Sequence, residues 1–207
     1  EGLAWTYAEQ GKLPEAIAAF RDLGDRAERH GGPDSESTRS ARRILGEIQL
    51  EAGETVAAEK LLLEVLERTR RVAKPGDSEL IAIQDSLHQL ARNRGDFDGA
   101  INYGRASLEG EIAKYGPTHP NTLQRRTTLS RTLIQGGKLD EAVATLRDVL
   151  VIQREKMGTD HFDTLTTSAF LGDALQTKGQ TSEARDLRRF VAEARVRLLG
   201  PDHPQSL

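Results

Sequence analysis

The sequence predicts an all-α fold, a right-handed α-solenoid of antiparallel helix hairpins that recur every 42 residues. Three observations lead to this prediction. A glycine returns at intervals of 42 residues, with a leucine eight residues before it and an alanine five residues after it, in five registers without an insertion. Apolar residues flank each glycine at helical spacing, and no segment shows the alternation of a β-strand. A constant period of this length is the signature of a helical repeat array.

Each recurring residue has a physical reason. The glycine is expected to end the first helix of a hairpin, because the left-handed backbone conformation there costs any other residue more. The alanine is expected where the second helix crosses close to the first. The recurring residues are Leu3, Leu45, Leu87, Leu129 and Leu171; Gly11, Gly53, Gly95, Gly137 and Gly179; and Ala16, Ala58, Ala100, Ala142 and Ala184.

A second helix is expected to end at another glycine, where a linker begins, and Gly32-Pro33-Asp34 and Pro75-Gly76-Asp77 are degenerate versions of this linker. The segment 141–157 has apolar residues at helical spacing and is predicted to be such a second helix. The linkers Gly116-Pro117-Thr118-His119-Pro120 and Gly200-Pro201-Asp202-His203-Pro204 are near copies of each other. Proline there suits the first turn of the next helix, whose N–H groups lack helical partners.

The predicted domain organisation is one array over residues 1–207. A hairpin cannot bury its apolar face alone, so neighbours must stack into a superhelix with one concave face. The expected repeats are 1–32 (incomplete), 33–74, 75–116, 117–158 and 159–200, with 201–207 as the start of a further truncated repeat. Both ends are expected to be cut from a longer array.

Composition excludes several classes of function. Net charge is −3, which provides no field to attract nucleic acid or anionic lipid. No apolar run approaches the ~20 residues that cross a bilayer. The absence of cysteine excludes disulfides, thiolate metal sites and a cysteine nucleophile, and suits a reducing, cytoplasmic location. Arginine outnumbers lysine by 22 to 7, which suggests a GC-rich bacterial gene.

No catalytic, cofactor or metal site is predicted. His119, His161 and His203 occupy the same point of successive repeats, so about 10 Å or more separates them, roughly one layer of packed helices. Ligands of one metal ion lie at ~2 Å from it, so these histidines are expected to hydrogen-bond the turns instead. No phosphate-binding loop or nucleophile elbow is present. The chain is therefore not expected to be an enzyme.

The repeat resembles a known family. Leu3-Ala4, Tyr7, Ala16 and Phe20 resemble the tetratricopeptide pattern, and the 42-residue period with its Gly-Pro-Asp-His-Pro linker resembles the kinesin-light-chain subclass and its bacterial relatives. That subclass carries paired asparagines just before the first-helix leucine. This chain has Arg43-Ile44, Asp85-Ser86, Thr127-Thr128 and Ala169-Phe170 there, so cargo recognition of the eukaryotic type is not expected.

The resemblance implies that the first helix of each repeat lines the concave groove. Side chains on the helix face away from the packed leucine then form a candidate peptide- or protein-binding surface of mixed charge. These candidates are Arg43, Glu47, Asp85, Gln89, Arg92, Asn93, Thr128, Arg131, Gln135, Phe170 and Asp173. The same face includes Trp5, Ile44, Leu50, Thr127 and Ala169.

Each candidate has a structural alternative. The polar face can simply be solvated. Phe170 is either an aromatic anchor for a ligand or a residue packed between neighbouring first helices. Trp5 is either an anchor or a core residue that the missing start of its helix leaves exposed.

The predicted function is a scaffold that binds a peptide or protein segment of unspecified identity, without nucleic acid or membrane. One alternative is the sensor or regulatory arm of a larger bacterial signalling protein, such as a Ser/Thr kinase or a switch NTPase. Kinase or P-loop motifs in the parent sequence would favour that alternative. The other is a self-assembly element that forms homo-oligomers through the repeat ends.

Overall fold

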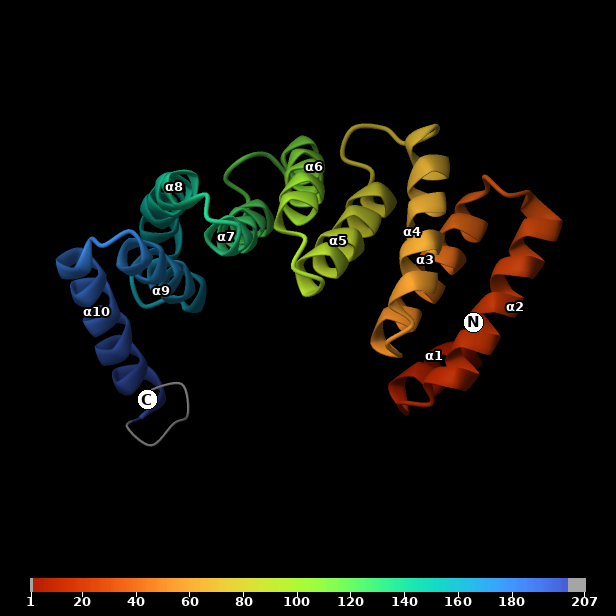
Figure 1. Cartoon of the computed structure of the whole chain (residues 1–207), viewed down its shortest axis with the longest axis horizontal. Coiled ribbons are helices and arrows are strands. Elements are labelled where there is room, and N and C mark those ends of the chain that lie inside the picture. Colours follow the sequence, from red (N-terminus) through yellow and green to blue (C-terminus); the bar gives the residue numbers. More distant parts are fainter. Residues whose placement is uncertain (1, 201–207) are drawn as a thin grey trace. The chain divides into compact units, whose positions relative to one another are not determined.

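The computed structural model describes residues 2–200, and this range contains ten α-helices and no strand (Figure 1). The predicted all-α class is therefore confirmed. The helices are α1 (Gly2–Glu9), α2 (Leu13–Gly31), α3 (Glu36–Glu51), α4 (Thr55–Arg70), α5 (Ser78–Asn93), α6 (Phe97–Tyr115), α7 (Pro120–Gln135), α8 (Leu139–Met157), α9 (Phe162–Thr177) and α10 (Thr181–Leu199). Odd-numbered helices are the first helices of the hairpins, and even-numbered ones are the second.

The chain forms two compact units, which divide between Lys114 and Tyr115. The first unit holds α1–α5 and all of α6 except its last residue, and the second unit holds α7–α10. The single array over 1–207 remains a prediction, and its expected further repeat at 201–207 lies outside the described residues.

Each unit has an apolar core between neighbouring hairpins. In the first unit, Phe20 centres one cluster and Leu62 and Leu87 form another. In the second unit, Leu146 and Leu175 form the main cluster. Leucine at the recurring position is buried in four registers, but Leu3 is 64% exposed. The expectation of a packed leucine is wrong there, because the short helix α1 packs chiefly against α2 alone.

The recurring glycine adopts the left-handed conformation in all five registers, as predicted. Gly137, between α7 and α8, has φ +75°, and nothing within 4 Å would obstruct an added Cβ. Backbone conformation and not space therefore requires glycine at this turn.

One position, repeated every 42 residues, caps the first helices. Ser35 and Asp77 accept hydrogen bonds from the backbone N–H groups of Thr38 and Leu80. Nδ1 of His119 and of His161 accepts from the N–H two residues later, at 3.2 Å in both turns. Such caps satisfy donors that have no partner inside the helix. The predicted turn-bonding role is confirmed for these two histidines, and His203 lies outside the described residues.

A second hydrogen bond closes most of the linkers. A threonine in the first turn donates from its hydroxyl to the linker glycine carbonyl at 2.8–2.9 Å: Thr38 to Gly32, Thr122 to Gly116 and Thr164 to Gly158. The α4–α5 linker has Leu80 at this position, which cannot donate from its side chain. Its glycine, Gly76, has φ +78° and packs against the backbone of Lys114 on α6.

The two helices of a hairpin cross at a pair of facing positions, one small and one large. In the second and third hairpins the small and the large residue stand on opposite helices. A Cβ added to Gly46 would meet the Leu62 side chain and the Ala58 carbonyl. In the next repeat the small residue is replaced by His88, and glycine, Gly104, stands at the position of Leu62. His88 is buried, and its Nδ1–H donates to the Ala100 carbonyl at 2.8 Å. The histidine thus occupies space that the absent leucine would fill.

Candidate functional site

A groove between α3 and α5 brings together several of the predicted site residues. It encloses about 490 Å³ in the first unit. Four candidates line it, namely Glu47, Asp85, Gln89 and Asn93. Glu51, Leu50, Ala82 and Ser86 complete the lining, and we call this feature the α3–α5 groove.

Helical spacing explains why these residues share one groove. On α3, Glu47 is followed by Leu50 and Glu51 three and four residues later. On α5, Ala82, Ser86, Gln89 and Asn93 are likewise separated by three or four residues. Residues at these spacings lie on one face of a helix, so each helix contributes a single stripe. The stripe of α5 ends in two exposed amides, which can both donate and accept hydrogen bonds.

An arginine joins the two helices at one end of the groove. Arg43 on α3 donates to Glu47 at 2.7 and 2.8 Å and to Glu79 on α5 at 3.0 Å. Ser86 on α5 also donates to Glu47, at 2.7 Å. Burial by itself lowers the pKa of Arg43, but the attraction of Glu47 and Glu79 outweighs burial and raises that pKa above its ordinary value. The guanidinium therefore remains charged and holds both carboxylates in place.

The groove carries excess negative charge. Glu47, Glu51 and Glu79 provide three carboxylates in and beside it, and Arg43 can neutralise only one of them. Asp85 is a further carboxylate in the lining, and it accepts a hydrogen bond from the buried Ser107 hydroxyl at 2.6 Å. In this part of the surface the carboxylates of Glu47, Glu51 and Glu79 therefore outnumber Arg43, so the local charge is acidic.

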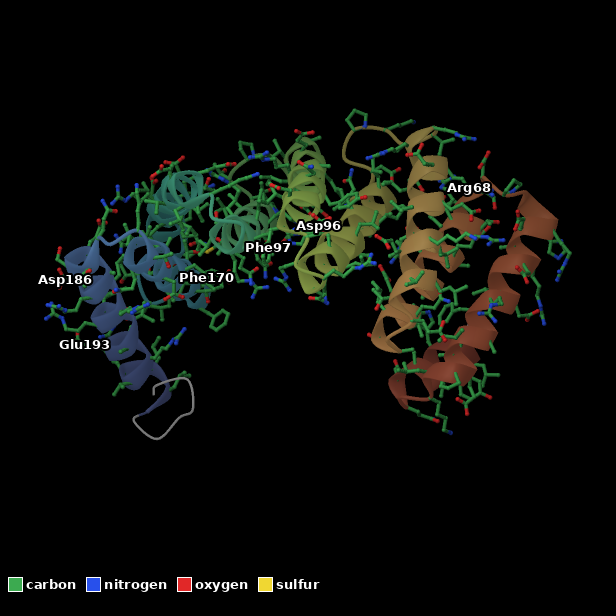
Figure 2. The ribbon with its side chains drawn as sticks, in the orientation of Figure 1. Arg68, Asp96, Phe97, Phe170, Asp186 and Glu193 are labelled. Atoms are coloured by element: carbon green, nitrogen blue, oxygen red, sulfur yellow. The ribbon has the colours of Figure 1, made fainter. Side chains whose placement is uncertain are left out.

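In the second unit, Phe170 extends from α9 and is half-buried (Figure 2). It packs against the core cluster around Leu146, together with Ile134 of α7. The guanidinium carbon of Arg131 lies 5.9 Å from the centre of its ring, within cation–π distance. These contacts favour the packed alternative for Phe170, and its role as an anchor stays a prediction.

The remaining candidates lie outside the α3–α5 groove. Arg92 is half-buried on α5, whereas Thr128 is half-buried and Gln135 exposed on α7. Asp173 on α9 is exposed and pairs with Arg188 of α10 at 2.8 Å.

Several other residues assigned to this face are packed. Thr127 is buried, donates to the Leu123 carbonyl at 3.0 Å and lies 3.1 Å from the Thr167 hydroxyl. Its assignment to the open face is wrong, because its side chain points into the contact between α7 and α9. Ile44 and Ala169 pack against core clusters, and Trp5 stands edge-on against buried Phe20 at 5.3 Å between ring centres. These contacts agree with the core alternative for Trp5.

Sequence reasoning missed Glu51, Ser86 and Glu79. Glu51 follows Glu47 by four residues, so the helical spacing that selected Glu47 could also have selected it. Glu79 pairs with Arg43 from the neighbouring repeat, and only the packing of α3 against α5 reveals that contact. Within residues 2–200, no group of three or more histidine or acidic side chains could hold a metal ion.

Comparison with family models identifies tetratricopeptide repeats in three segments, at residues 79–155, 164–205 and 2–27. No curated protein sequence matches the chain. Among solved structures, the nearly identical TPR-like repeats of a Podosopora anserina kinesin light chain match with a TM-score of 0.87 at 21% identity. That match covers 96% of this chain and 94% of the other.

Two further solved structures match. BtubC (BKLC) from P. vanneervenii has a TM-score of 0.70 at 18% identity, over 94% of this chain and 76% of its own. YrrB, described as a TPR protein with an unusual peptide-binding site, has a TM-score of 0.64 at 16% identity, over 99% of this chain and 87% of its own. At these identities the similarity establishes the fold. Among residues 2–200, no helix is both long and apolar enough to cross a membrane.

Proposed function

Because the chain belongs to the tetratricopeptide-repeat family, whose members are in general scaffolds for protein–protein contacts, we propose that its α3–α5 groove binds an extended, basic peptide segment of another protein. The observation that carries this proposal is the excess of the carboxylates of Glu47, Glu51 and Glu79 over Arg43 in and beside the groove. YrrB, a protein of the same fold, has a peptide-binding site, which supports the general mode of recognition.

The chemistry of the groove suits such a segment. Glu51 is exposed at the end of α3, where an arginine or lysine of the ligand can pair with it. The amides of Gln89 and Asn93 can each donate to a peptide carbonyl and accept from a peptide N–H. Leu50 and Ala82 supply an apolar surface for the stems of long basic side chains.

The test uses short fluorescent peptides that share one backbone length and alternate small apolar residues with arginine, glutamine or glutamate. Fluorescence anisotropy should show binding of the arginine peptide, weaker binding of the glutamine peptide and none of the glutamate peptide. Affinity for the arginine peptide should fall as salt is raised, because ions screen the exposed carboxylates.

Two variants locate the site. Glu51→Arg should weaken the arginine peptide about tenfold or more, because it replaces an attraction by a repulsion. Glu155→Arg makes the same charge change on an exposed position of α8 and should leave binding unchanged. Equal affinity for all three peptides, or an equal effect of both variants, would refute the proposed groove.

A further inference from the structure

The second unit has a different groove, formed by the second helices α8 and α10. It encloses about 460 Å³, and apolar side chains dominate its lining. Val151 on α8 and Phe190 and Leu187 on α10 provide its walls, with buried Leu150 as part of its floor. We call it the α8–α10 groove. It is separate from the first-helix surface considered above.

The repeat register shows that two of these apolar residues are unusual. Positions equivalent to Val151 in the other four repeats are all acidic: Asp25, Glu67, Glu109 and Glu193. Positions equivalent to Phe190 are acidic in three repeats and alanine in one: Asp22, Glu64, Asp148 and Ala106. Apolar residues thus replace acidic ones at two positions that line a single groove.

Within residues 2–200, core packing does not explain valine at this position. Val151 is 66% exposed, so it contributes little to the core of its own unit. An exposed carboxylate at this position is well solvated, whereas an exposed valine keeps apolar surface in water. Leu187 and Phe190 beside it are partly buried and pack against core clusters, so Val151 stands exposed next to an apolar wall of α10. An exposed apolar side chain in such surroundings favours an interaction surface.

The charges at the edges of the groove are arranged asymmetrically. The α8 edge carries Arg147 and Arg154, and the α10 edge carries Glu183 and Asp186, the latter labelled in Figure 2. Arg147 and Glu183 already pair with each other at 2.8–2.9 Å. Arg154 is exposed, and Asp186 is exposed in a surface pair with Arg189.

Such a surface is complementary to itself. A two-fold axis running along the groove would lay α8 of one copy over α10 of the other, with the basic edge against the acidic edge. The same operation would bring the exposed Val151 of each copy toward the apolar α10 wall of the other. An isologous interface requires this kind of self-complementarity.

We propose that the α8–α10 groove is the contact surface of a symmetric dimer of this chain. Val151 and Phe190 form its apolar centre, and Arg154 of each copy faces the acidic edge of the other. This contact uses second helices of the second unit, and so differs from association through the repeat ends.

The first experiment measures mass against concentration by sedimentation velocity. The wild-type mass should rise toward that of a dimer as concentration increases. Val151→Glu, which restores the acidic residue of the register, should weaken dimerisation at least tenfold. Val56→Glu is the matched control, because Val56 is 74% exposed on α4 and lies outside the groove. A wild-type mass that stays monomeric into the millimolar range would overturn the proposal, as would equal effects of the two variants.

The second experiment tests the symmetry. Arg154→Glu alone and Asp186→Arg alone should each be mainly monomeric, because each places like charges on facing edges in both halves of the dimer. An equimolar mixture should dimerise again, since each chain then meets the opposite charge at both edges. Failure of the mixture to associate while the wild type dimerises would exclude this arrangement. Both positions are exposed, so the folds of the variants, checked by circular dichroism, should be unaffected.

Discussion

In the third hairpin, the large His88 faces the small Gly104, and this arrangement predicts how substitutions at the two positions change the free energy of unfolding. His88→Ala removes a buried ring and its hydrogen bond to the Ala100 carbonyl, and should lower the free energy of unfolding by about 2–3 kcal/mol. Alanine is chosen because Ala4 occupies the same position in the first repeat. Gly104→Leu alone forces a leucine against the imidazole. The overpacking costs about 1–3 kcal/mol, whereas replacing a glycine inside a helix gains ~1 kcal/mol. This single variant should therefore also have a lower free energy of unfolding than the wild type.

The double variant His88→Ala/Gly104→Leu should lose less stability than the sum of the two single losses. With alanine at 88 and leucine at 104, the hairpin has the arrangement of Gly46 with Leu62, and the leucine fills the space that the ring leaves. The double variant should therefore lie within about 1 kcal/mol of the wild type, although the single effects add to about 2–5 kcal/mol. Urea unfolding followed by circular dichroism measures all four proteins. Additive losses in the double variant would show that the two residues do not share one space.

Three further predictions concern local features. Asp77→Ala should lower the free energy of unfolding in urea by about 1 kcal/mol, whereas Asp77→Ser should cost little, because Ser35 caps α3 from the same register; equal losses would contradict the capping role. Gly137→Ala should cost about 1–2 kcal/mol in urea unfolding from its φ of +75° alone, and no loss would mean that the turn relaxes. Burial, and to a lesser degree Glu59 and Asp96, raises the pKa of Tyr103 above its ordinary value, although Arg70 lowers it, so absorbance titration should show one tyrosine ionising late. The unfolded chain then loses that proton first, so stability should fall as pH rises through about 10, and less so in Tyr103→Phe.

The sequence predicts the hairpins well because the recurring glycine, alanine and leucine each meet a requirement of the local backbone or of helix packing at their own position. A left-handed turn accepts glycine most readily, so Gly137 and its equivalents mark where first helices end. The histidine caps follow from position in the same way, since His119 stands in register with Ser35 and Asp77. These features depend on residues close together in the chain.

The candidate site was less predictable, because it depends on contacts between repeats. Thr127 has the spacing of an open-face residue, but its hydroxyl meets Thr167 across the α7–α9 contact. The sequence pattern predicts Arg43 as a charge available to a ligand. In the structure Arg43 instead donates a hydrogen bond to Glu79, 36 residues later. Side-chain partners on neighbouring helices decide such cases, and no local pattern specifies them.

The α4–α5 linker, with Leu80 in place of threonine, has a mechanical consequence. In the other linkers among residues 2–200, a threonine in the first turn of the following helix closes the linker by a hydrogen bond to its glycine carbonyl. The α3–α5 groove spans the one described joint that lacks it, and there the Arg43–Glu79 pair ties the two first helices directly. The spacing between α3 and α5 thus depends on the Arg43–Glu79 ion pair, and a charged ligand can compete with either partner of that pair. A basic ligand that draws Glu79 away from Arg43 would remove this tie between α3 and α5 and so change the spacing of the groove walls.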